Sequence, residues 1–267
     1  MKLDVLTKQV VNLTRGVGMF ISQEARKFSE KDVEVKGKHD FVSYVDKTAE
    51  KMLIQELRKL LPEAGFIAEE DQKLEKGERF SWIVDPLDGT TNFIHSIPLY
   101  SISIALMDRD EVILGVVYEI NQEEAFYAWK GGKAYLNGKV IGVTETNNLD
   151  NSLIATGFPY YDYSKLNQYI DLFKDLLKSS RGIRRLGSAA VDLVYVAAGR
   201  FDVFYEYGLH AWDVAAGVLI VKQAGGLVTD FNNSNDFIFG GQIVATNGAV
   251  HDEFLSKLND YFQKDQL

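Results

Sequence analysis

Two aspartates near the middle of the chain stand three residues apart in the run WIVDPLDGTTNF, which covers residues 82–93. Proline at position 86 disfavours helical geometry at Asp85 and removes a backbone donor. We therefore expect the apolar strand to end at this point and the chain to turn. Such a turn lets Asp85 and Asp88 point into one pocket, where they offer hard oxygen ligands to a cation.

The residues that follow are suited to holding an anion. Gly89 allows close backbone approach, and the amides of Gly89, Thr90 and Thr91 are expected to open a short helix whose N-terminus faces that anion. Carboxylates beside such a turn repel phosphate unless cations lie between them, and Mg²⁺ binds both carboxylates and phosphate oxygens. The sequence therefore predicts a magnesium site. An Asx-type turn that only caps a helix is the alternative for an isolated Asp-Gly-Thr.

Two further acidic segments are candidate ligands. Glu69 to Asp71 follow the strand-like GFIA, and Asp213 precedes an apolar helix predicted over 214–223. A solvated turn is the alternative for the first segment, and an N-terminal helix cap is the alternative for Asp213. The chain has no cysteine, so any metal here must be held by oxygen or imidazole.

Composition limits the classes of partner. The formal net charge of -9 gives a poor field for nucleic acid or acidic lipid. The N-terminal residues predict an amphipathic helix and not a signal peptide, and no apolar run approaches the length of a membrane span. We expect a cytoplasmic protein with no nucleic-acid partner and no membrane association.

The elements that must position these residues follow from hydrophobic periodicity. Apolar spacing predicts a helix over 3–27 and a second helix that Asp46 caps and that ends before Pro62. Strands are predicted at 65–69 and 80–85, and an antiparallel meander at 100–130. The later predictions are strands at 152–156, 201–206 and 242–246, and helices at 164–178, 187–198, 212–224 and 249–263. This order indicates a layered α/β architecture with halves 1–145 and 146–267, joined as one compact unit with a cleft between them.

The runs WIVDPLDGTTNFIH and WDVAAGVLIVKQAGG resemble the two signatures of the inositol monophosphatase family, in the family's order and separation. The segment VSYVDKTAEKMLIQELRKLLPEAGFIAEED also looks like the family's, and the likeness covers roughly residues 5–260. The resemblance implies the layered αβαβα carbohydrate-phosphatase fold, of mixed α+β and α/β character. It also implies two to three Mg²⁺ ions per active site.

Roles are implied by position in these motifs. The family's metal ligands correspond to Glu69, Asp85, the carbonyl of Leu87, Asp88 and Asp213. Its catalytic residues correspond to Glu69 and to the pair Thr90 and Asp46, which orients the attacking water. Its substrate contacts correspond to Gly89, Thr90, Ser188, Ala189, Glu206 and Asp213. The resemblance does not assign His95 or His210 as ligands, and we expect structural or rim positions for both.

The implied reaction is hydrolysis of a phosphate monoester, foremost inositol 1-phosphate, by in-line attack of a metal-activated water. Other small polyol, sugar or nucleotide phosphates stay open as substrates, including fructose 1,6-bisphosphate, NADP, 2′(3′)-nucleotides and histidinol phosphate. The segment 156–160 resembles a loop of bacterial members, which leaves inositol itself open. Lithium sensitivity and a homodimer are further implications of the resemblance.

A role of another class also stays open, because some bacterial relatives bind the transcription machinery. The basic cluster over 181–185 is the segment that such a role would use, and a solvated turn or a dimer rim is the alternative for it. Gly16 and Gly18 do not form a dinucleotide motif, because they lie inside a predicted helix, follow no strand and lack the third glycine.

Overall fold

The computed structural model describes residues 2–27, 33–37, 40–71 and 75–262. Its helices are α1 (Leu3–Ala25), α2 (Tyr44–Leu60), α3 (Thr90–Ile94), α4 (Leu166–Leu176), α5 (Ala189–Ala197), α6 (Ala211–Gln223) and α7 (His251–Phe262). Its strands are β1 (Val33–Gly37), β2 (Asp40–Ser43), β3 (Gly65–Ala68), β4 (Phe80–Asp88), β5 (Ser101–Asp108), β6 (Glu111–Glu119), β7 (Glu124–Trp129), β8 (Tyr135–Leu136), β9 (Lys139–Val140), β10 (Leu153–Thr156), β11 (Gly182–Arg184), β12 (Val203–Tyr207), β13 (Leu227–Thr229) and β14 (Gln242–Thr246).

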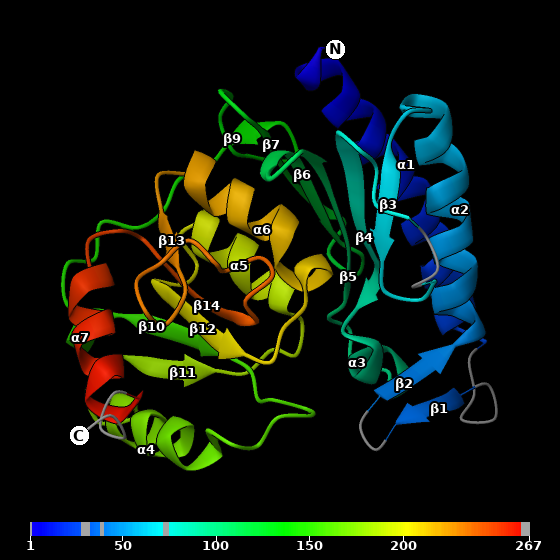
Figure 1. The fold of residues 1–267 in the computed structure, drawn as a ribbon. Coiled ribbons are helices and arrows are strands. Elements are labelled where there is room, and N and C mark those ends of the chain that lie inside the picture. The colour runs from blue at the N-terminus through cyan, green and yellow to red at the C-terminus, as the bar shows by residue number, and fades with distance from the viewer. Residues whose placement is uncertain (1, 28–32, 38–39, 72–74, 263–267) are drawn as a thin grey trace.

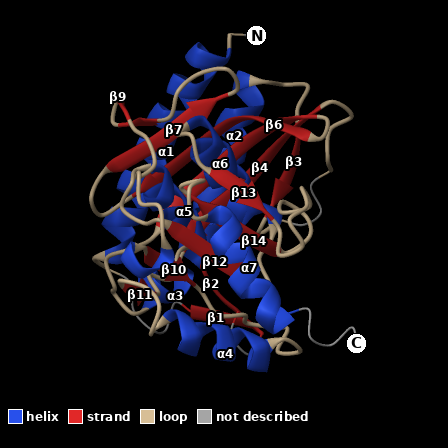
Figure 2. Cartoon of the chain, turned by 90° about the vertical axis from the view of Figure 1, so that its left-hand side faces the viewer, coloured by secondary structure: helices blue, strands red, loops and turns tan. Residues whose placement is uncertain are grey.

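The elements form five layers (Figure 1). A seven-stranded sheet has the order β3-β4-β5-β6-β7-β8-β9, and a five-stranded sheet has the order β11-β10-β12-β14-β13. Helices α1 and α2 cover the outer face of the larger sheet, α5 and α6 lie between the sheets, and α4 and α7 cover the smaller sheet. Seen from the side of the smaller sheet, α7 lies across β12 and β14 (Figure 2). The αβαβα prediction is confirmed.

The two central helices explain why the layers stay together. Every residue of α5 is buried, and the stretch Val214–Val221 of α6 is buried as well. A helix that is apolar on all sides must be covered on all sides, which the two sheets accomplish. One apolar core therefore runs from β4 to β7 through α5 and α6 to β12 and β14.

The first helix packs through the face that its periodicity predicted. Val10, Val17 and Ile21 are buried against the larger sheet. A Cβ on Gly18 would lie 2.6 Å from the ring of Tyr118, so the helix approaches β6 too closely for a side chain at that position. Gly18 therefore serves helix packing, in agreement with the rejection of a dinucleotide motif.

Several predicted boundaries were wrong. Helix α2 begins at Tyr44, so Asp46 lies inside its first turn and does not cap it. Strand β4 does not end at Asp85: it continues to Asp88, with an irregular register against β5 between these two residues. Proline at 86 thus lies in a bulge and does not end the strand. Proline has no N–H to donate to β5, and in a bulge the pairing between strands is interrupted, so that donor is not needed. Of the other helices, α1, α4, α5 and α7 are two to four residues shorter than predicted. Helix α6 has the predicted length but begins and ends one residue earlier.

The predictions also missed elements. The β1–β2 hairpin and the short strands β8, β9, β11 and β13 were not foreseen, since each has only two to five residues. The meander of β5, β6 and β7 is antiparallel, as predicted. The division at residues 145 and 146 stays a prediction. Among the described residues, no helix is both long enough and apolar enough to span a membrane.

Candidate active site

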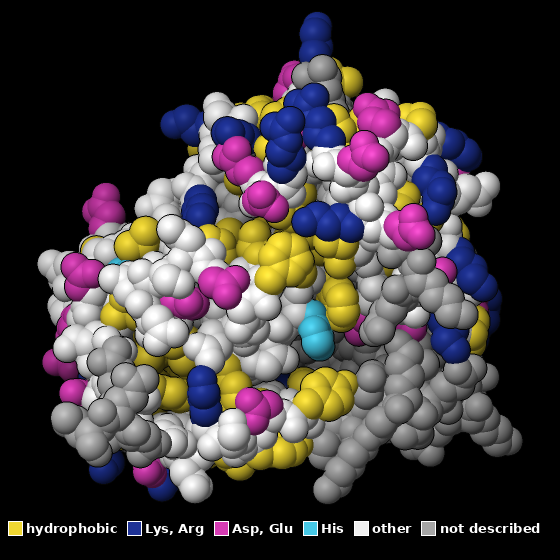
Figure 3. Space-filling view, in the orientation of Figure 1, with side chains coloured by type: hydrophobic (Ala, Val, Ile, Leu, Met, Phe, Trp, Pro, Cys, Tyr) yellow, Lys and Arg dark blue, Asp and Glu magenta, His cyan; other side chains and the backbone are white. Residues whose placement is uncertain are grey.

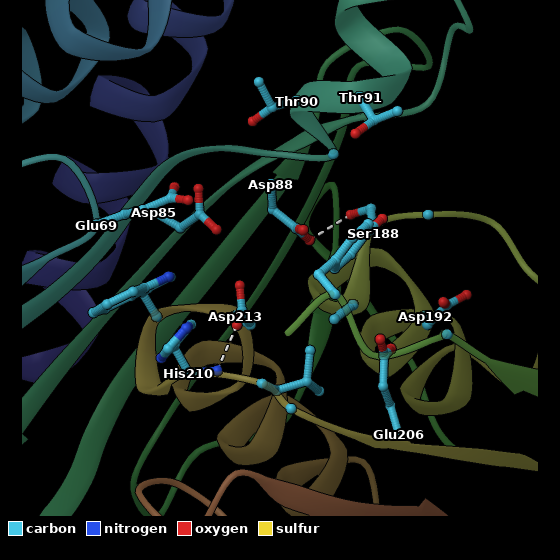
Figure 4. Close-up of a pocket in the computed structure, with 18 of the residues that line it drawn as sticks. Glu69, Asp85, Asp88, Thr90, Thr91, Ser188, Asp192, Glu206, His210 and Asp213 are labelled. Carbon is cyan, nitrogen blue, oxygen red and sulfur yellow. Dashed lines mark hydrogen bonds between the residues drawn. The ribbon is translucent and has the colours of Figure 1, made fainter. Parts of the chain in front are cut away.

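The ends of two parallel strands bring the first acids together. Strands β3 and β4 pair so that Ala68 lies opposite Val84, and the amide of Glu69 donates to the Val84 carbonyl at 3.3 Å. Glu69 therefore stands beside Asp85, as Figure 4 shows. The bulge after Asp85 is closed by the Leu87 amide, which donates to Asp85 Oδ1 at 2.9 Å. This local turn aims Asp85 and Asp88 into the same pocket.

The third acid arrives from the other half of the chain. Asp213 is the third residue of α6, and its Oδ2 accepts the His210 amide at 2.6 Å. Ser103 on β5 donates to the Trp212 carbonyl at 3.0 Å, which fixes the start of α6 against the larger sheet. Asp213 is not the N-cap residue, which is His210, but its side chain does cap the start of α6 as the third residue of a capping box. Its carboxylate can bind that amide and still face the pocket.

These three aspartates form a compact oxygen cluster. Asp85, Asp88 and Asp213 each offer one ligand oxygen, and all three oxygens lie within 4.8 Å of one another. Burial, with the charges of Glu69 and the other two aspartates, raises the pKa of Asp85 well above its usual range. Burial raises the pKa of Asp88 to about 6, and burial and the Asp88 charge raise the pKa of Asp213 to about 7. Such a cluster is destabilised by mutual repulsion, which a divalent cation relieves.

The predicted donor set fits a hard divalent cation such as Mg²⁺. Its members are carboxylates and a backbone carbonyl, with no thiolate or imidazole among the predicted ligands, and Mg²⁺ prefers such hard oxygens. His95 is exposed just after α3, and His210 lies at the pocket rim with its ring stacked on Trp212 at 4.6 Å between centroids. The rim position expected for His210 is thus confirmed.

Helix α2 supports the cluster from behind. Thr90 Oγ1 lies 3.2 Å from Asp46 Oδ1 and 3.0 Å from the Leu87 carbonyl, so the threonine hydroxyl stands between α2 and the bulge. One turn further along α2, the buried Glu50 carboxylate accepts the amides of Glu70 and Asp71 at 2.8 and 2.9 Å. Glu50 was not predicted. It holds the turn that carries Glu69.

The turn after Asp88 leads into a short helix, as its sequence predicted, and the role of its amides in holding an anion stays a prediction. Gly89 has φ of +98°, a conformation that favours glycine, and it precedes the single short helix turn of α3. Asn92 in α3 donates to the carbonyls of Leu99 and Leu186 at 2.8 and 2.9 Å. These bonds tie the turn to the loop that leads into α5.

Helix α5 holds Asp88 from the opposite side. The Ser188 hydroxyl donates to Asp88 Oδ2 at 2.5 Å, and the Ala190 amide donates to the same oxygen at 2.8 Å. Figure 4 shows the first of these bonds across the pocket. Ser188 is also the N-cap of α5 and accepts the Val191 amide at 3.3 Å. Its position therefore links a helix start to a candidate metal ligand.

Nearly all predicted site residues line one pocket. These are Glu69, Asp85, Leu87, Asp88, Gly89, Thr90, Ser188, Ala189, Glu206 and Asp213. Asp46 lies behind Thr90 and does not line it. The lining also includes Tyr160, Tyr161, Arg185 and Asp192, which the sequence did not single out as site residues. The only available signal was an acid inside the otherwise apolar run AAVDLVYVA, which contains Asp192.

Comparison with known proteins agrees with this geometry. The family model described as "Inositol monophosphatase family" matches residues 2–263. The chain belongs to the inositol monophosphatase family. Among the relatives, the protein named Nus factor SuhB from Pseudomonas aeruginosa is 41% identical over 252 residues, covering 92% of this chain and 93% of its own length. The inositol-1-monophosphatase of Mesorhizobium japonicum is 38% identical, covering 94% of each chain.

A solved structure supports the family assignment at the level of the fold. The IMPase of Thermotoga maritima is 38% identical, and its structure superposes with a TM-score of 0.87 over 96% of this chain and 98% of its own. Family membership places the chain among metal-dependent phosphatases. The pocket between the two sheets is the only place among the described residues where three acids gather at metal-binding distance.

Proposed function

We propose that this protein hydrolyses a phosphate monoester of a small polyol, with inositol 1-phosphate as the leading substrate and Mg²⁺ as cofactor. The observation that carries the proposal is the oxygen cluster of Asp85, Asp88 and Asp213, within 4.8 Å, on the wall of a pocket that also exposes Thr90. Glu69 and the Leu87 carbonyl extend the ligand set. Two or three ions fit this number of oxygens.

Bound Mg²⁺ supplies charge neutralisation at the phosphate and lowers the pKa of the attacking water. The protein's own groups do the positioning, which dominates phosphoryl transfer. Thr90 Oγ1 donates its hydrogen to Asp46, which leaves its lone pairs to accept a hydrogen bond from the attacking water and so to orient the water's own lone pair toward phosphorus. The amides of Gly89 and Thr90 hold the phosphate oxygens, and Ser188 with the Ala190 amide keeps Asp88 oriented. The products are the free alcohol and inorganic phosphate.

The pocket wall opposite Thr90 suits the polyol. Glu206 extends from β12 into the pocket and is buried, with 6% of its surface exposed. A carboxylate there can accept hydroxyl donors of the leaving group. The name of the relative from Mesorhizobium japonicum supports inositol 1-phosphate as the first substrate to test.

A substrate panel tests the proposal. Phosphate release is measured with Mg²⁺ from inositol 1-phosphate, fructose 1,6-bisphosphate, NADP, a 2′-nucleotide, histidinol phosphate and β-glycerophosphate. We expect inositol 1-phosphate to give the highest kcat/KM and chelator to stop release. A higher kcat/KM for fructose 1,6-bisphosphate or a nucleotide would reassign the substrate. Release that persists in excess chelator would contradict the metal mechanism.

A second candidate function is binding to the transcription machinery. It is favoured by the 41% identity to a relative named as a Nus factor. Arg181, Arg184 and Arg185 are all exposed, and Arg185 also lines the pocket, where it donates to the Tyr160 hydroxyl at 2.7 Å. On the face drawn in Figure 3, basic and acidic side chains are interspersed. A pull-down against RNA polymerase and its elongation factors, with Arg181→Glu and Arg184→Glu as variants, tests this role; absence of specific binding would end it.

The resemblance also implies a homodimer and inhibition by lithium. Both are proposals for this chain, and analytical ultracentrifugation and a lithium titration of phosphate release test them. A monomer at micromolar concentration, or full activity in excess lithium, would refute the respective proposal.

A further inference from the structure

A second buried carboxylate lies next to Glu206. Asp192 stands in the first turn of α5 and lines the same pocket, with 1% of its surface exposed. Figure 4 shows its carboxylate near that of Glu206, one from the helix and the other from β12. Burial, with the charge of Glu206, raises the pKa of Asp192 well above its usual range. Two acids therefore share one end of the pocket.

Neither acid is satisfied by the protein. Among the described residues, no donor bonds to Asp192 Oδ1, which is fully buried, and the Glu206 carboxylate accepts no hydrogen bond either. Asp88, in contrast, accepts both Ser188 and the Ala190 amide. An unpaired buried carboxylate is costly, so folded proteins retain one mainly where a ligand completes it.

A neighbouring cation supplies charge but not the missing hydrogen bonds. The charge of Arg185 lowers the pKa of Asp192 and of Glu206, against the larger effect of burial. The guanidinium itself donates to the Tyr160 hydroxyl at 2.7 Å. With one positive charge already present, a neutral donor fits the two acceptors better than a second cation does.

We propose that Asp192 is a second acceptor for substrate hydroxyl groups, so that Asp192 and Glu206 together read neighbouring hydroxyls of a polyol ring. This inference rests on the proposed function and deepens it. A substrate that lacks these hydroxyls leaves a buried acceptor unpaired in the complex, which is a strong source of discrimination. Asp192 is a specificity residue in this view, remote from the reacting phosphorus.

A cycle of two substrates and two proteins tests the inference. Inositol 1-phosphate carries the hydroxyls, and p-nitrophenyl phosphate carries none. We expect Asp192→Ala to lower kcat/KM for inositol 1-phosphate roughly 10- to 100-fold more than for p-nitrophenyl phosphate, chiefly through KM. Asp192→Asn keeps the shape and one of the two acceptor oxygens, so it should give a smaller selective loss in the same direction, which serves as the readout if the alanine variant does not fold. Asp110→Asn, in the exposed turn between β5 and β6, is the matched control.

The outcomes separate the inference from the proposed function. Equal loss for both substrates would assign Asp192 a structural role and overturn the inference, as would no loss for either. A selective gain for an amino sugar phosphate that disappears in Asp192→Ala would assign an ammonium ligand instead. A binding measurement that needs no turnover adds free myo-inositol to the protein in the presence of Mg²⁺ and phosphate and detects the bound polyol by saturation-transfer NMR. Weaker binding in Asp192→Ala than in wild type supports the inference even if the esters are not hydrolysed, and equal binding contradicts it.

Discussion

The carboxylate of Glu206 lies directly against the α-carbon of Gly157. A Cβ on Gly157 would stand 2.0 Å from Glu206 Oε1, so no side chain fits at this position while Glu206 keeps its place. The Gly157 carbonyl accepts the buried Tyr169 hydroxyl at 3.0 Å, and the same hydroxyl lies 2.6 Å from Thr156 Oγ1. The loop and the acid thus define each other's position.

We therefore expect Gly157→Ala to displace Glu206 and raise KM for inositol 1-phosphate by roughly tenfold, since one hydroxyl contact is lost. The matched control is Gly16→Ala in α1, where a Cβ meets nothing within 4 Å. That substitution should stabilise the protein by about 1 kcal/mol, because alanine is the better helix former. Steady-state kinetics and thermal unfolding of both variants check the pair. An unchanged KM in Gly157→Ala would show that Glu206 does not contact substrate.

Glu50 gives a second prediction, about metal affinity. Its carboxylate accepts the amides of Glu70 and Asp71, and a glutamine can accept only through its single oxygen. Glu50→Gln should loosen the turn behind Glu69 and weaken Mn²⁺ binding by roughly 10- to 100-fold, the usual effect of losing a group that orients a ligand. Electron paramagnetic resonance of free Mn²⁺ measures this without turnover. Glu56→Gln, on the exposed side of α2, should bind like wild type; equal affinity in both variants would mean that Glu50 only stabilises the fold.

The raised pKa values of the cluster predict how pH changes the stability of the metal-free protein. A carboxyl whose pKa is higher in the folded state binds protons more tightly there than when unfolded, so stability falls as pH rises through the folded value. The values of about 6 for Asp88 and about 7 for Asp213 place this loss between weakly acidic and neutral pH. The gain in Tm on adding Mg²⁺ should consequently be larger at about pH 8 than at about pH 5. Calorimetric scans with chelator and with Mg²⁺ provide the comparison, and a gain that shrinks with rising pH would refute the cluster's electrostatics.

Much of the site could be predicted because its residues occur where apolar segments end. Glu69 and Asp85 follow buried strand residues, and parallel pairing of β3 with β4 brings such positions side by side. The predicted α5 and α6 were recognisable because their apolar runs are continuous. Periodicity and turn chemistry are local, and these features depend on local sequence.

The remainder depends on contacts between distant segments. Glu50 acts through a turn 20 residues away, and nothing in the α2 sequence distinguishes it from a surface acid. Asp46 has the residue type of a helix cap, but α2 begins two residues before it, at Tyr44. The side chain of Asp46 instead accepts the hydroxyl of Thr90, a partner 44 residues away. Asp192 is hidden in an apolar helix that also forms the core. In each case a residue distant in the sequence determines the environment of the acidic side chain, and the local sequence pattern does not encode that contact.

The most direct test of the account is the dependence of phosphate release on Mg²⁺ in wild type, Asp213→Asn and the control Asp110→Asn. Asp213 is the one cluster member contributed by α6, so its loss should raise the Mg²⁺ concentration for half-maximal activity and lower kcat/KM for inositol 1-phosphate by roughly 100-fold or more. Asp110→Asn should match wild type, because its side chain is exposed far from the cluster in sequence and lines no part of the pocket. An Asp213→Asn variant with wild-type kcat/KM and wild-type Mg²⁺ dependence would contradict catalysis at this cluster.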